Sequence, residues 1–76
     1  MMPRDMDLIR ELLLRFERDD VSFPEGRTQL EVAYHVNQMV RSGLIQAEIV
    51  EGPVAGRVRP VEFIFHDIEP AGHEFL

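Results

Sequence analysis

The stretch YHVNQMVRSGLI, residues 34–45, decides the fold of this chain. It predicts the second half of an amphipathic helix, a helix stop at Gly43 and the start of a strand at Ile45. Upstream, Thr28 is a good N-cap, and Glu31 three positions later completes a capping box. We therefore expect one helix over residues 28–42. Its inward stripe is expected to comprise Val32, Ala33, Val36, Met39 and Val40.

A first helix is predicted over about residues 5–18, because apolar residues recur there at helical spacing. The stripe consists of Met6, Ile9, Leu12, Leu13 and Phe16, with Leu8 on its flank. Leu14 breaks the pattern and falls on the charged side. It is either an isolated exposed leucine, which is common, or a contact for another chain. Between the helices, Val21 and Phe23 predict a brief edge strand that Pro24 ends.

Downstream of Gly43 the pattern predicts a β-hairpin. Alternating residues indicate strands over 45–51 and 58–66, joined by a turn or short wing at 52–56. Pro60 lacks a backbone N–H, so it belongs at an edge or a bulge. Ile64 falls on the face opposite Val61, Phe63 and Phe65, so that face of the hairpin is not entirely polar. Pro70 opens a short helix over 71–76, whose Phe75 and Leu76 are expected to dock on the core.

The predicted order is helix, short strand, helix, β-hairpin wing and short C-terminal helix. This is an α+β, winged-helix-like domain that occupies residues 1–76 as a single unit. A standard helix-turn-helix needs two helices before the wing. Here residues 19–27 must replace the first of them, so the helix-turn-helix is expected to be reduced.

Composition narrows the function classes. The chain has 76 residues, no cysteine and a net charge of −6, and all eight of its basic residues are arginine. The negative charge argues against non-specific binding of nucleic acid, although it leaves room for a local arginine patch. No apolar run is long enough to span a membrane, and the first residues lack the features of a signal peptide. A cytoplasmic location, with no cofactor and no small-molecule substrate, is therefore expected.

Three blocks of sequence carry a family resemblance: residues 4–10, residues 34–45 and residues 71–76. Together they resemble a family of small bacterial and phage-associated winged-helix proteins that is catalogued only as a domain of unknown function. The resemblance implies a regulatory or prophage-related role and supplies no catalytic residues. Members of such a family usually continue with a longer C-terminal helix, so the chain is expected to be a truncated or a short member.

Two functional hypotheses follow from the residues. In the first, the chain is a protein-interaction module or homodimer that uses the exposed Leu14 and the apolar turn around Val54. In the second, it is a sequence-specific DNA-binding regulator that reads bases with the outward face of the helix and contacts phosphates with the wing. The DNA-binding candidates are Arg27, Tyr34, His35, Asn37, Gln38, Arg41, Arg57 and Arg59. A solvated helix face carries similar residues, and Tyr34 is expected to cover the hairpin rather than to contact DNA.

Enzymatic activity is the weakest hypothesis. The spacing of His35, His66 and His73 matches no metal-ligand pattern, so no metal site is expected. Turn and cap chemistry accounts for the serines and the threonine, and the chain has no glycine-rich phosphate loop. The sequence therefore favours a domain that is not an enzyme.

Overall fold

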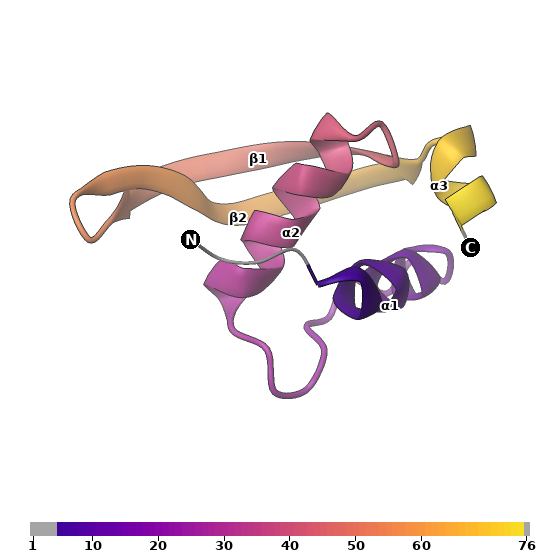
Figure 1. The fold of residues 1–76 in the computed structure, drawn as a ribbon, viewed down its shortest axis with the longest axis horizontal. Coiled ribbons are helices and arrows are strands. Elements are labelled where there is room, and N and C mark those ends of the chain that lie inside the picture. Colours follow the sequence, from indigo (N-terminus) through magenta and orange to yellow (C-terminus); the bar gives the residue numbers. More distant parts are fainter. Residues whose placement is uncertain (1–4, 76) are drawn as a thin grey trace.

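A computed structural model describes residues 5–75. Along the chain its elements are α1 (Met6–Phe16), α2 (Gln29–Arg41), β1 (Ile45–Val54), β2 (Arg57–Ile68) and α3 (Pro70–Phe75). Helices α1 and α2 lie on the same side of the hairpin, and α3 lies near its open end (Figure 1). The α+β class is thus confirmed, with helices covering one face of an antiparallel ribbon.

Helix α1 is shorter than the predicted range because its ends are set by local backbone chemistry. The carboxylate of Asp5 accepts hydrogen bonds from the N–H groups of Asp7 and Leu8 at 3.0 and 3.1 Å, which caps the first turn. After Phe16 the chain turns, and Asp19 adopts a left-handed φ of 55°. The assignment of Met6 to the core stripe is wrong, since Met6 is exposed, whereas Leu8 is buried.

The connection between α1 and α2 contains neither the strand expected at residues 21–23 nor a helix. The carboxylate of Asp20 accepts the N–H of Ser22 at 2.9 Å, and this local turn replaces the hydrogen bonds that a strand would make. Phe23 instead packs against Phe63 of β2, with the ring centroids 6.5 Å apart. The predicted short strand is therefore wrong. The segment predicted to stand in for the first helix of a helix-turn-helix has no helical turn.

Helix α2 confirms the N-cap at Thr28 and the stop at Gly43, but not the reciprocal half of the capping box, because the carboxylate of Glu31 pairs with Arg27 instead. The hydroxyl of Thr28 accepts the N–H of Glu31 at 3.1 Å, and the helix runs to Arg41. Gly43 follows with a φ of +74°, and the N–H of Leu44 donates to the carbonyl of Met39 at 2.9 Å. The buried residues of this helix are Val32, Ala33, His35, Val36 and Met39.

The hairpin is longer than predicted, because residues 52–54 continue β1 instead of forming the turn. The two-residue turn is Ala55-Gly56, with φ values of 51° and 80° that match the twist of a tight hairpin. Pro60 lies opposite Glu51 beside a register shift, which confirms its predicted place at a bulge. Pro53 is tolerated inside β1 because each strand of a two-stranded ribbon is also an edge.

The core lies between the helices and one face of the hairpin, here named the inner face and made of Ala47, Ile49, Phe63 and Phe65. The ring of Phe16 stacks on that of Phe65 with a centroid separation of 4.4 Å. Phe75 packs on the same core, as predicted, whereas Leu76 lies outside the described residues. A Cβ at Gly72 would collide with the carbonyl oxygen of Leu44, so only glycine lets α3 approach this closely.

Candidate functional site

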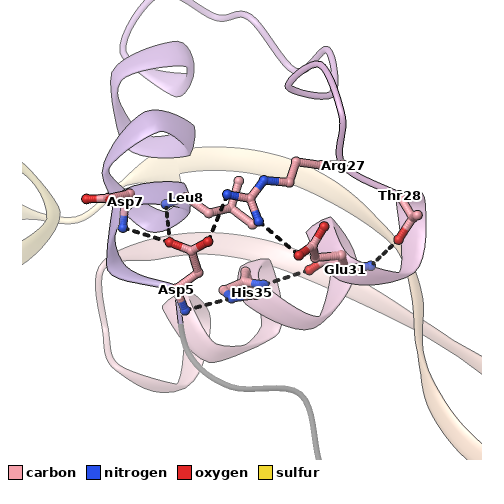
Figure 2. Close-up of polar contacts among 7 residues, drawn as sticks. All are labelled: Asp5, Asp7, Leu8, Arg27, Thr28, Glu31 and His35. Carbon is pink, nitrogen blue, oxygen red and sulfur yellow. Dashed lines mark hydrogen bonds and ion pairs between the residues drawn. The ribbon is translucent and has the colours of Figure 1, made fainter.

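A cluster of polar side chains joins the start of α1 to the first turns of α2 (Figure 2). The guanidinium of Arg27 lies 2.8 Å from a carboxylate oxygen of Asp5 and 2.9 Å from one of Glu31. Hydrogen bonds from the Leu8 N–H and from Arg27 lower the pKa of Asp5, and the two carboxylates raise the pKa of Arg27. Arg27, a predicted phosphate contact, thus holds two helices together through its ion pairs.

His35 lies at the centre of this cluster and is completely buried. The backbone N–H of Asp5 donates to its Nε2 at 3.0 Å, so Nε2 is the unprotonated nitrogen. Its Nδ1 lies 2.8 Å from the carbonyl oxygen of Glu31 and donates to it (Figure 2). The placement of His35 on the outward face of the helix is therefore wrong. The ring faces α1, where its Nε2 accepts the Asp5 N–H, while its Nδ1 donates to the Glu31 carbonyl of its own helix.

The remaining polar candidates on α2 present only a limited surface. Tyr34, Asn37 and Gln38 are half-buried, and Arg41 in the last turn is exposed. Tyr34 lines a groove of about 190 Å³ together with residues of the hairpin near its turn. The other lining residues are Leu30, Val54, Arg59 and Pro60. Tyr34 therefore lies beside the hairpin, and Val54 lines the same groove rather than an exposed tip.

The exposed arginines that were predicted to contact DNA lie in two separate places, Arg41 at the end of α2 and Arg57 and Arg59 beside the hairpin turn. Arg59 shares the groove with Leu30 in the first turn of α2, whereas Arg41 ends that helix. The rise of a helix places Leu30 and Arg41 about 16 Å apart along the axis of α2. Within residues 5–75 no ion pair joins Arg41, Arg57 or Arg59 to a carboxylate, so these side chains remain available to a ligand.

Leu14 is 47% exposed, as expected from its position opposite the buried stripe of α1. Its helical neighbours on the solvent side are charged: Asp7, Arg10, Glu11 and Arg18. A single leucine among charges is an ordinary surface feature, so Leu14 does not form an apolar patch with its neighbours on α1.

A larger apolar surface lies on the side of the hairpin that faces away from the helices. We name it the outer face and define it by Glu48 and Val50 of β1 and by Glu62 and Ile64 of β2. Val50 is 42% exposed beside the core residue Ile49, and Ile64 is 54% exposed between the core residues Phe63 and Phe65. Nearer the turn, Val58 is 72% exposed. Sequence reasoning noted Ile64 but missed Val50, whose place in the strand alternation gave the same signal.

Two broader properties complete the description of this part of the chain. Among the described residues, no helix combines the length and the apolar character needed to cross a membrane. Nor do any three histidine, aspartate or glutamate side chains between residues 5 and 75 gather closely enough to hold a metal ion.

Comparison with known proteins gives a family and no closer relative. Neither the curated proteins nor the solved structures contain a significant match to the chain. The model of one family, described as "Hypothetical protein (DUF2513)", matches residues 3–76. That match covers nearly the whole chain and agrees with the predicted resemblance to a domain of unknown function. The chain belongs to the DUF2513 family.

Proposed function

We propose that this chain is a non-enzymatic interaction domain of winged-helix type that binds another protein through the outer face of its hairpin. The observation that carries the proposal is the exposure of Val50 and Ile64 on a face that no helix of the described residues covers. Burying an exposed aliphatic side chain against a partner is favourable by roughly 25 cal/mol per Å² of apolar area. The family resemblance adds a regulatory role in a bacterial or phage setting, and we place the domain in the cytoplasm.

The outer face favours a different protein over a second copy of the chain. Its two carboxylates, Glu48 and Glu62, alternate with Val50 and Ile64. Two such faces brought together would place like charges opposite one another, and the net charge of −6 adds long-range repulsion. We therefore propose a complex with a different protein.

DNA binding is the second candidate, and a specific observation favours it. Arg57 and Arg59 lie exposed beside the hairpin turn, and Arg59 shares a groove with Tyr34 of α2. This is the place from which a wing contacts phosphates or the minor groove. Against it, His35 is buried and Arg27 is paired with two carboxylates, so fewer side chains than expected are free for the DNA.

The experiment compares the wild type with two variants in one binding assay. Proteins that co-purify with the tagged chain are identified, produced in pure form and titrated against it by calorimetry. The Val50→Thr/Ile64→Thr variant keeps β-branched residues and is expected to weaken binding at least tenfold, a loss of about 1.4 kcal/mol. Leu14→Gln removes an equally exposed aliphatic side chain from α1 and is expected to leave binding unchanged.

The DNA hypothesis is tested in parallel with Arg57→Ala/Arg59→Ala and a mixed-sequence duplex at low salt. We expect no measurable change in fluorescence anisotropy with the wild-type protein. Binding that falls steeply with salt and is lost in the arginine variant would favour DNA as the ligand. A complex that survives the Val50→Thr/Ile64→Thr change but not Leu14→Gln would move the interface to α1 and overturn the proposal.

A further inference from the structure

Charge is segregated along the hairpin in a way that identifies a class of partner. Residues 45–53 and 60–68 contain four carboxylates, Glu48, Glu51, Glu62 and Asp67, and no arginine. Both arginines of the hairpin, Arg57 and Arg59, are confined to the segment just after the turn. A partner of this surface therefore meets negative charge over most of the ribbon.

The strand register places apolar and acidic side chains of the outer face in a crossed pattern. Glu48 lies opposite Ile64, and Val50 lies opposite Glu62. Val50 and Ile64 are thus diagonal neighbours, with a carboxylate on either side of the diagonal. The Nε2 atom of His66 lies 3.1 Å from a carboxylate oxygen of Glu48, which leaves Glu62 as the more open of the two acidic positions. An apolar strip with acidic flanks results.

The hydrogen bonding of the hairpin indicates which secondary structure a segment bound over its outer face should have. Strands β1 and β2 direct their ladder hydrogen bonds toward each other within the sheet. A segment that lies over the face must therefore satisfy its own backbone groups. A helix does so internally, and helices already cover the inner face of this hairpin (Figure 1).

We propose that the outer face binds a basic amphipathic helix of a partner protein, a proposal that rests on the interaction function above. Aliphatic residues of that helix pack on Val50 and Ile64, and lysine or arginine side chains on its flanks pair with Glu48 and Glu62. A helix of about 14 residues, roughly 21 Å long, covers this strip and the acidic part of the ribbon, away from Arg57 and Arg59. The net charge of −6 and the two carboxylates of the outer face disfavour a second copy of this chain as the occupant.

The test uses the whole chain and a synthetic helical peptide of about 14 residues, made of leucine and lysine with the leucines on one face. A peptide of the same composition in scrambled order serves as the first control. It keeps the positive charge but has no apolar stripe. A leucine and glutamate peptide with the original pattern serves as the second. Binding is measured by calorimetry, and the site is located from amide chemical shifts in NMR spectra.

We expect the patterned lysine peptide to bind at least tenfold more tightly than either control, with shifts concentrated at Glu48, Val50, Glu62 and Ile64. Loss of two charge pairs in Glu48→Gln/Glu62→Gln is expected to weaken binding about tenfold at low salt. The matched variant Glu25→Gln/Glu74→Gln changes the net charge equally at exposed positions outside the hairpin and is expected to bind like the wild type.

Two results overturn the proposal. Equal binding of the patterned and scrambled lysine peptides would show that only overall charge attracts them. Shifts centred on the solvent side of α1 would place the site elsewhere. If the peptide fails while a natural complex still depends on Val50 and Ile64, the partner is not a basic helix but the interaction function stands. If the peptide does not bind and no natural complex depends on Val50 and Ile64, the proposed interaction function is wrong as well.

Discussion

The two faces of the hairpin are built from the same strands but have opposite roles. On the inner face, Phe63 and Phe65 pack against the helical core. On the outer face, Ile64 lies between them in sequence and remains 54% exposed. Folding removes most of the surface of the inner residues from water and leaves the outer ones largely in contact with it. The apolar residues of the inner face therefore stabilise the domain, whereas those of the outer face gain most from a partner.

The largest expected effect is on the inner face. Phe65→Ala removes the ring that stacks on Phe16 and is expected to lower the free energy of unfolding by about 3 kcal/mol. Urea unfolding followed by circular dichroism measures this change. Phe65→Leu, which keeps most of the apolar volume, is the matched control and is expected to lose about 1 kcal/mol. A loss for Phe65→Ala of only about 0.5 kcal/mol, which is typical of a surface substitution, would erase the difference between the faces.

A somewhat smaller effect is expected at the helix junction behind the inner face. His35→Ala leaves the N–H of Asp5 and the carbonyl of Glu31 without their side-chain partner. An unsatisfied buried group costs about 1–3 kcal/mol, so we expect a loss of about 2 kcal/mol. Amide exchange at the start of α1 should accelerate more than exchange in the hairpin. Uniform acceleration would mean that the ring does not specifically hold the two helices together.

The same junction is expected to make stability depend on pH. The pKa of Asp5 is lowered in the folded state, chiefly by the Leu8 N–H and then by Arg27, so the unfolded state binds a proton more readily. The stabilisation is complete above the ordinary pKa near 3.8 and is lost as the pH falls through the lower, folded value. Urea midpoints measured between about pH 6 and pH 2 should therefore fall less in Asp5→Asn than in the wild type. Identical pH profiles would contradict the role of this carboxylate.

Local chemistry made much of the fold predictable. Thr28 and Gly43 mark the two ends of α2 because an N-cap hydroxyl and a left-handed glycine act on their immediate neighbours. The length of the two hairpin strands was harder to predict. Gly52 and Pro53 are typical of turns but continue β1, and the tight turn places Ala55 at a φ of 51°, which alanine rarely adopts.

The candidate site was harder to predict because it depends on how elements pack. The helical periodicity placed His35 on the outward face, yet α1 approaches α2 at that position and buries the ring. The pairing of Arg27 with Asp5 joins residues 22 positions apart, a contact that no local pattern indicates. The outer face was partly visible in the exposed position of Ile64, but its definition required the register that sets Val50 diagonally beside it.

The smallest change in stability is expected for substitutions on the outer face. Measuring it together with binding tests most directly whether this face serves binding and not folding. Urea unfolding and titration with the leucine and lysine peptide are carried out on the same samples of wild type and Val50→Thr/Ile64→Thr. We expect the free energy of unfolding to stay within about 0.5 kcal/mol per substitution and the peptide affinity to fall at least tenfold. A loss of stability comparable to that of Phe65→Ala, or unchanged affinity, would contradict this expectation.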